Sequence, residues 1–380
     1  MADTHTDVDL DEEEEEERSA NHLELFLDLV FVFAVTQIAS LISHEPVGSG
    51  TAKGLLIAML VWWQWSQFTW AGTAIDLEKN ARTRVLVLGC IPFALLMTIS
   101  IPEVFHSTGI WFGSAYLGVQ LLVLGMHATE ALADPRIRTG FLRYASLAAI
   151  APVMVFVGGF LHGTAQIAAW VLAALLNVLA GLRATGSEWN IVPEHFVERH
   201  SLFIIISLGE VLVAAGGAAT NSGLDRLTAF AIIVSVAVAC MWWWVYFGFL
   251  PQVMEQSLRA VKGTARGTMA RDIFTFGHFP LVFGLILYAV VVKHLVAHPD
   301  GTLAADDRWL LGLSVALFVG GQMANHWRFA RRVIPERPVA IVAAAGLCAL
   351  GAWVPGLAVV AGIAVLLGIM QAVTWRRVTR

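Results

Sequence analysis

The sequence predicts an all-α, polytopic integral membrane protein with about 12 transmembrane helices, and its composition and its long apolar runs are the main reasons. Of 380 residues, 57% are hydrophobic and 14% are charged, and the mean hydropathy is +0.70. Soluble domains carry roughly 25% charged residues, so this chain has too few to cover a surface that faces water. Runs such as residues 170–182 and 341–373 lack the polar stripe of a water-soluble amphipathic helix.

An acidic segment precedes the first apolar run. Residues 1–20 contain the unbroken run Glu12–Glu17, and such dense like charge predicts a disordered cytoplasmic tail. A docking role for this tail is the alternative. The acidic start does not resemble a signal peptide, so we expect the first helix to remain in the membrane.

Each element follows from the length that a spanning helix needs, about 20 apolar residues. Charged and proline- or glycine-rich breaks separate the apolar runs. The predicted spans are residues 23–42, 54–75, 85–101, 110–129, 142–161, 165–182, 201–219, 227–250, 273–295, 310–325, 339–353 and 357–375.

The distribution of lysine and arginine supports this map. With the N-terminus in the cytoplasm, 20 of the 24 basic residues fall on the cytoplasmic side. The other side holds only Lys53, Arg226, Lys293 and Arg308. The positive-inside rule therefore predicts that both termini are cytoplasmic and that the number of spans is even.

The two halves of the chain show similar motifs, which predicts two six-helix repeats at residues 21–183 and 184–380. His22 precedes Leu25-Phe26 as His200 precedes Leu202-Phe203, and the tryptophan run at 62–65 corresponds to the run at 242–244. Six spans per half indicate a parallel repeat about an axis along the membrane normal, which is one known transporter plan.

Charged residues inside the predicted spans are candidates for a functional site, because a charge in lipid is costly. Glu24 and Asp28 share one face of the first span. Glu210 lies roughly 16 Å beyond Arg199 along the seventh span, near the bilayer midplane. We expect an aqueous vestibule open to the cytoplasm with Glu210 at its deepest point. The predicted ion or substrate site comprises Glu210, Asp28, Glu24, Glu198, Arg199, His200, His195, Asp76 and His127.

Structural roles compete with this interpretation. Glu24 and Glu198 could mark the interface or stabilise helix N-termini. Arg199 could pair with Asp28 or Glu24 as a clasp between the halves, and His127 could be a packing residue. Gly209, before Glu210, is expected to allow close helix approach.

Tryptophans form a second candidate feature. Four of those within the predicted spans are expected to line the site: Trp62, Trp63, Trp65 and Trp243. Core packing between the halves and a cage for an organic cation both explain them.

No cofactor or metal site is indicated. Cys90, Cys240 and Cys348 lie in apolar runs without metal-ligand spacing, and the His195-x-x-Glu198-x-His200 spacing matches no zinc motif. The expected partners are the lipid bilayer and an unknown small solute, proton or cation. Nucleic acid is not expected, and the sequence is compatible with a homo-oligomer.

The motifs also resemble those of a known family. The first is Glu24-Leu25-Phe26-Leu27-Asp28-Leu29-Val30-Phe31-Val32-Phe33-Ala34; the second is Pro193-x-His195-x-x-Glu198-Arg199-His200, followed by Leu208-Gly209-Glu210. Together with the tryptophan-rich second span, Asp76 and Arg82, they resemble the bacterial low temperature requirement protein A family from about His22 to the end of the tenth span. Where that family has a further acid after the aromatic run, this chain has Asp76 and Glu78. The resemblance implies a multi-pass protein of the bacterial inner membrane linked by name to growth in the cold, and it implies no substrate or reaction.

The leading functional hypothesis is an ion-coupled carrier or permease for a small solute, in which Glu210 takes and releases a proton or cation. His195, Arg199 and His200 would gate or tune that site. The runner-up is a membrane-embedded enzyme acting on a lipid, with acid–base roles for Glu194, His195, Glu198 and His200. A non-catalytic assembly or sensor protein is the third hypothesis.

Overall fold

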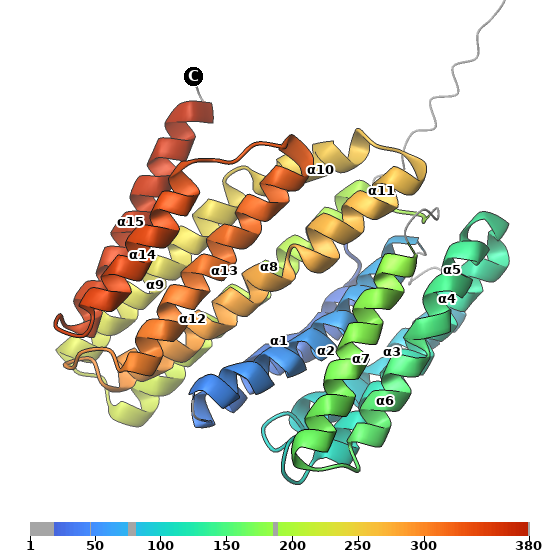
Figure 1. The fold of residues 1–380 in the computed structure, drawn as a ribbon, viewed down its shortest axis with the longest axis horizontal. Coiled ribbons are helices and arrows are strands. Elements are labelled where there is room, and N and C mark those ends of the chain that lie inside the picture. The colour runs from blue at the N-terminus through green and yellow to red at the C-terminus, as the bar shows by residue number, and fades with distance from the viewer. Residues whose placement is uncertain (1–18, 46, 75–80, 185–188, 379–380) are drawn as a thin grey trace, which may run out of the picture.

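The computed structural model describes residues 19–45, 47–74, 81–184 and 189–378, and these fold almost entirely into helices (Figure 1). Most of the predicted tail and all of Asp76 lie outside the described residues. An isolated bridge between Thr302 and Pro355 is the only strand-like pairing among the described residues. The elements are α1 (His22–His44), α2 (Val47–Ala74), α3 (Ala81–Ile99), α4 (Gly109–Ala133), α5 (Pro135–Ala148), α6 (Ile150–Gly158), α7 (Gly163–Arg183), α8 (Pro193–Ser222), α9 (Arg226–Phe247), α10 (Leu250–Arg259), α11 (Gly263–Ala270), the π-helix η1 (Arg271–Phe276), α12 (Phe279–Ala297), α13 (Ala305–Ala330), α14 (Glu336–Leu350) and α15 (Gly356–Val378).

The helices form two bundles that lie side by side in Figure 1. The first bundle holds α1–α7 and the second holds α8–α15. The bundles pack against each other through α1 and α2 on one side and α8 and α12 on the other. These four helices therefore carry most of the contact between the bundles.

The helix axes give the molecule two ends. We call the end where α1 and α8 begin, at His22 and Pro193, the terminal face. The end where α1 finishes, at His44, is the distal face. The short helices α10 and α11 lie at the terminal face, at the top of Figure 1.

The prediction of a polytopic all-α membrane protein is confirmed. Each of the 12 predicted spans overlaps one or more helices, and nine helical stretches among the described residues are long and apolar enough to cross a membrane. The predicted fifth span is divided between α5 and α6, and the ninth begins in η1. Helices α2, α13 and α14 are not among the nine. α14 has only 15 residues, and in α2 the polar Gln64, Ser66, Gln67 and Thr69 are buried inside the protein.

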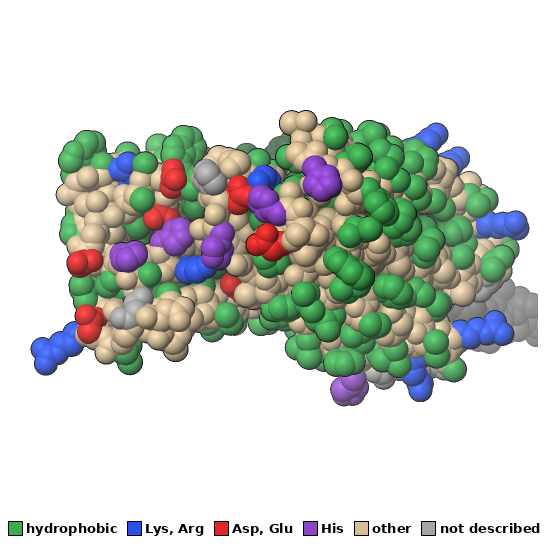
Figure 2. Space-filling model, turned by 90° about the horizontal axis from the view of Figure 1, so that it is seen from below, with side chains coloured by type: hydrophobic (Ala, Val, Ile, Leu, Met, Phe, Trp, Pro, Cys, Tyr) green, Lys and Arg blue, Asp and Glu red, His purple; other side chains and the backbone are tan. Residues whose placement is uncertain are grey.

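The placement of polar and apolar side chains is that of a membrane protein. Large apolar side chains such as Val342 and Leu132 are exposed on the outer surface, whereas Gln120 and Asn177 are buried. Polar groups gather at the distal face, where acidic and histidine side chains cluster over part of the surface in Figure 2. At this face His294 Nδ1 lies 2.6 Å from Asp307 Oδ1. This pattern fits a lipid-facing belt with a water-facing end.

Candidate functional site

A buried group of charges joins α1 of the first bundle to α8 of the second. Glu24 and Asp28 lie one turn apart on α1, and His195 and Arg199 lie one turn apart on α8. All four side chains are buried. Arg199 donates from Nη1 to Asp28 Oδ2 at 2.5 Å and from Nη2 to Asp28 Oδ1 at 2.9 Å. His195 Nε2 lies 3.0 Å from Glu24 Oε2. These four residues, which we call the charge clasp, contain the Arg199–Asp28 pair that the sequence suggested.

Local capping explains why α1 begins where it can form the clasp. Asn21 Oδ1 accepts a hydrogen bond from Glu24 N at 2.9 Å, and Glu24 Oε2 accepts one from Asn21 N at 3.1 Å, which is a capping box. Ala20 N donates to Glu198 Oε2 at 2.7 Å, so Glu198 ties the chain before α1 to α8. The structure thus places Glu198 beside the clasp, as an anchor for the entry into α1.

The clasp has an uneven charge count. Two carboxylates face one guanidinium and one imidazole, so the group is neutral only when one extra proton resides on the pair formed by Glu24 and His195. Without this proton, a net negative charge would be buried, which costs several kcal/mol. Glu24 Oε1 and His195 Nδ1 have no hydrogen-bond partner among the described residues. The arrangement can therefore hold one exchangeable proton.

Aromatic and histidine rings enclose the clasp. Trp65 Nε1 donates to Asp28 Oδ1 at 2.9 Å, and the Trp65 ring lies 5.1 Å from the ring of His200. His200 Nδ1 donates to Phe196 O at 2.8 Å, which leaves Nε2 as a buried acceptor with no partner among the described residues. Trp62 Nε1 donates to Thr275 O of η1 at 2.7 Å. Trp62 and Trp65 are both buried core residues that hold the clasp and η1 in place.

A second histidine extends this network. His278 Nδ1 donates to Ile273 O at 2.9 Å, and its Nε2 accepts from the hydroxyl of Tyr246 at 2.8 Å. The rings of His200 and His278 are 5.2 Å apart. Tyr246 was not predicted as a site residue, because a tyrosine in an apolar run gives no signal until its partner is known.

Glu210 lies apart from the clasp, toward the distal face. Its carboxylate accepts a hydrogen bond from the Thr36 hydroxyl of α1, and the Lys293 ammonium of α12 interacts with it electrostatically. Lys293 Nζ also donates to Ser43 Oγ at 3.0 Å. We call Thr36, Glu210 and Lys293 the distal site.

An apolar layer separates the clasp from the distal site. Phe31 of α1 and Phe203 of α8 are buried between the two groups. The separation along α8, from Arg199 to Glu210, is roughly 16 Å at 1.5 Å per residue. The aqueous vestibule open to the cytoplasm, with Glu210 at its deepest point, stays a prediction. The expectation for Gly209 is wrong, since a Cβ there would meet nothing within 4 Å.

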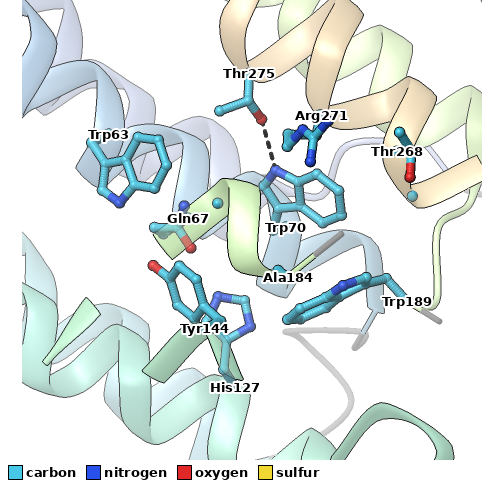
Figure 3. Close-up of a pocket in the computed structure, with 12 residues that line it drawn as sticks. Trp63, Gln67, Trp70, His127, Tyr144, Ala184, Trp189, Thr268, Arg271 and Thr275 are labelled. Atoms are coloured by element: carbon cyan, nitrogen blue, oxygen red, sulfur yellow. Dashed lines mark hydrogen bonds between the residues drawn. The ribbon is translucent and has the colours of Figure 1, made fainter. Parts of the chain in front are cut away.

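A small pocket of about 40 Å³ lies between the bundles, on the terminal-face side (Figure 3). Its lining includes Trp63, Trp70, His127, Tyr144, Trp189 and Arg271. The structure therefore places the predicted His127 and Trp63 together, although not with the clasp. Trp243 is 51% exposed on the outer surface of α9 and stacks on Phe247, so it lines neither site.

Within the described ranges, no group of three or more His, Cys, Asp or Glu side chains could hold a metal ion.

Comparison with known proteins identifies one family. The family model described as "Bacterial low temperature requirement A protein (LtrA)" matches residues 19–372. A Rhizobium meliloti (strain 1021) protein, described as "Uncharacterized protein RA0937", is 28% identical over 311 residues, which cover 79% of this chain and 75% of that protein. No solved structure matches.

Proposed function

The chain belongs to the bacterial low temperature requirement A family, and we propose that it is a proton-coupled carrier of a small solute in the bacterial inner membrane. In this proposal the terminal face is cytoplasmic, because 20 of the 24 lysines and arginines fall on that side of the predicted topology. The observation that supports this proposal most strongly is the charge clasp. The clasp joins the two bundles, and its charges balance only when it binds one additional proton.

Proton transfer at the clasp would change how strongly the bundles hold together. The Arg199–Asp28 ion pair and the contact between His195 and Glu24 are buried and cross from α1 to α8. Protonating Glu24 removes its attraction for His195 and for Arg199, whose Nε is 3.9 Å from Glu24 Oε1. A weaker clasp lets the terminal ends of the bundles part, which is the movement that alternating access requires.

Two titratable sites on one helix pair support the coupling. The clasp and the distal site both use α1 and α8, and the layer around Phe31 and Phe203 separates them. A proton or cation that reaches Glu210 from the distal face and leaves through the clasp would cross this layer only when the helices move. This is the separation of access that distinguishes a carrier from an open channel.

The packing order of the helices supports the two-repeat plan. In the first bundle α1 packs on α2 and α3, α3 on α4, α4 on α6, and α6 on α7. In the second bundle α8 packs on α9 and α12, α12 on α13, α13 on α14, and α14 on α15. The order is the same under the correspondence that the sequence motifs suggested. A parallel repeat of this kind suits rocking of one bundle against the other.

Proton flux in proteoliposomes tests the proposal. Vesicles with a trapped pH dye would receive a pH gradient and, outside, a filtered small-molecule extract of bacterial cells as the source of solute. We expect flux with the wild-type protein and at least a tenfold lower initial rate with Glu24→Gln and with Glu210→Gln. Glu103→Gln is the matched control, because Glu103 is exposed and belongs to neither site.

The possible results of this experiment distinguish the roles of Glu24 and Glu210 from the carrier function itself. Equal flux in wild type and both site variants would contradict the assigned roles. No flux above that of empty vesicles, from protein that elutes as a folded species, would contradict the carrier function itself.

A further inference from the structure

A groove on the outer surface of the second bundle lies between α13 and α14. In Figure 1, α14 lies at the outer edge of this bundle, away from the first bundle. The groove has a volume of about 620 Å³, which is within the range of small-molecule sites, about 300–1,000 Å³. It begins at the distal face and follows α13 over residues 305–316, a length of roughly 16 Å at 1.5 Å per residue. The groove therefore has room for an extended hydrocarbon chain.

Small apolar side chains form much of the groove surface. Gly312 and Ala316 contribute from α13, and Ala345 and Ala349 contribute from α14. The outer surface of a membrane-spanning bundle faces lipid tails, and no water is present there to hydrate a cavity. Such a groove is therefore filled either by a lipid chain or by another helix.

Arg308 supplies a positive charge at the distal end of the groove. Its side chain is half-buried and passes Gly351, where an added Cβ would lie 3.2 Å from Arg308 Cδ. Among the described residues, the Arg308 guanidinium has no ion pair and no hydrogen bond. The neighbouring acids do not supply one, because Asp307 is paired with His294 and Asp306 lies two residues away, on another side of the helix. The charge of Arg308 is thus available to an anion at the mouth of the groove.

Two tryptophans mark this end of the groove as the level of the lipid headgroups. Trp309 is 74% exposed and Trp353 is 79% exposed, and both line the groove. Tryptophan is enriched at the membrane–water interface, where its ring contacts acyl chains and its N–H reaches polar groups. Since Arg308 lines the groove beside these two side chains, its guanidinium lies at the depth of the lipid phosphates.

From the size, lining and charge of this groove, we propose that it binds a phospholipid of the leaflet at the distal face. One acyl chain lies along the small residues of α13 and α14, and the phosphate faces the Arg308 guanidinium, whose planar shape suits phosphate oxygens. A second copy of this chain is the other occupant that small residues favour. Two copies packed through this groove about a two-fold axis would bring their Arg308 side chains together without a counter-charge, whereas a phosphate supplies one.

The proposed lipid site is separate from the clasp and from the distal site. Its residues belong to α13, α14 and the turn that follows α14, whereas those two sites use α1, α8 and α12. The inference goes beyond the carrier function and does not depend on it. A bound phospholipid would anchor the distal ends of α13 and α14 in the leaflet, and α13 packs on α12, which carries Lys293 of the distal site.

Photo-crosslinking of the wild-type protein locates the lipid. The probe is a phosphatidylglycerol with a diazirine in one acyl chain, added in trace amounts to the full-length protein in dodecylmaltoside, and peptide mass spectrometry maps the label. We expect about fivefold more label on residues 305–316 and 341–353 than on the outer surface of α9. That surface is a matched reference, because Phe230 and Ile233 are also apolar and exposed. Equal label on the two surfaces would overturn the site.

A matched probe and two variants test the phosphate contact. A diacylglycerol with the same diazirine chain lacks the phosphate, and we expect it to place about tenfold less label in the groove. Arg308→Gln should reduce the label from phosphatidylglycerol to the level of the diacylglycerol. Arg226→Gln, which removes an exposed arginine of α9 at the distal face, should leave the label unchanged.

Two results would contradict the proposed occupant. Equal labelling of the groove by both probes in the wild-type protein would overturn the phosphate contact, and this result does not depend on the folding of a variant. A groove without lipid label, together with a disulfide between two copies of Trp309→Cys that the wild type does not form in membranes, would assign the groove to a second copy of the chain. Proton flux in vesicles tests the carrier function separately, so failure of either proposal leaves the other standing.

Discussion

Breaking the Arg199–Asp28 pair should destabilise the protein more than any surface change. Asp28 is buried and accepts three hydrogen bonds, two from Arg199 and one from Trp65. Asp28→Asn keeps the shape of the side chain and leaves the Arg199 guanidinium buried without its main counter-charge. Loss of one partner from a buried ion pair costs about 3–5 kcal/mol. Because Glu24 Oε1 remains 3.9 Å from Arg199 Nε, we expect the lower end, about 3 kcal/mol.

The measurement is a double-mutant cycle on the free energy of unfolding. Reversible unfolding in mixed micelles of dodecylmaltoside and sodium dodecyl sulfate, followed by circular dichroism, would compare Asp28→Asn, Arg199→Gln and the double variant. Removing both charges relieves the unpaired charge that each single variant leaves, so we expect a coupling energy of about 1–3 kcal/mol. Asp300→Asn, in an exposed distal loop, is the control for loss of a carboxylate alone. Additive effects, with a coupling energy below about 0.5 kcal/mol, would refute the direct pairing of Asp28 with Arg199.

Two further predictions concern the distal loop and the end of η1. Lys53 Nζ lies 2.7 Å from Glu45 Oε1 and holds the pKa of Glu45 below its ordinary value of 4.5. Lys53→Met should therefore raise the pKa of Glu45, which carboxyl carbon NMR would measure. Above pH 4.5 the wild type should be more stable than Lys53→Met by less than about 1 kcal/mol. This difference in stability should vanish as the pH falls through the lowered pKa of Glu45. An unchanged Glu45 titration would contradict the pairing. Gly277→Ala should lower the thermal stability, because a Cβ would overlap the side chain of Asn325 and the carbonyl of Ile273. Gly209→Ala, which meets nothing within 4 Å, should be neutral or slightly stabilising, and equal effects of the two alanines would contradict this packing.

The residues of the clasp could be found in the sequence, because the free-energy cost of a charge in an apolar run arises within one helix. Glu24 and Asp28 are two acids four residues apart in an apolar run. Their charges need polar or charged partners wherever the helix packs. The pairing with Arg199 was one of the roles considered, and the structure contains it. The choice between Glu24 and Asp28 as its main partner depended on the register of α1 against α8, which helical periodicity does not specify.

The place of Glu210 could not be predicted in this way. Its depth along α8 followed from the helical rise, and the structure agrees that it lies far from Arg199. Its partners in the structure are Thr36 of α1 and Lys293 of α12. These partners are distant in sequence, and neither carries a recognisable motif.

By itself, the sequence determined the membrane-spanning helical class, the positions of the helices and the identity of the buried charges, because hydrophobic length and the cost of a charge in lipid act within one helix. Only the tertiary structure decided that Trp62 and Trp65 support the clasp, that Trp63 lines a different pocket with His127, and that Trp243 faces outward. The four tryptophans have the same chemistry and similar sequence surroundings. Their different roles come from the rotation of α2 and α9 about their axes, which is set by packing between helices far apart in the chain.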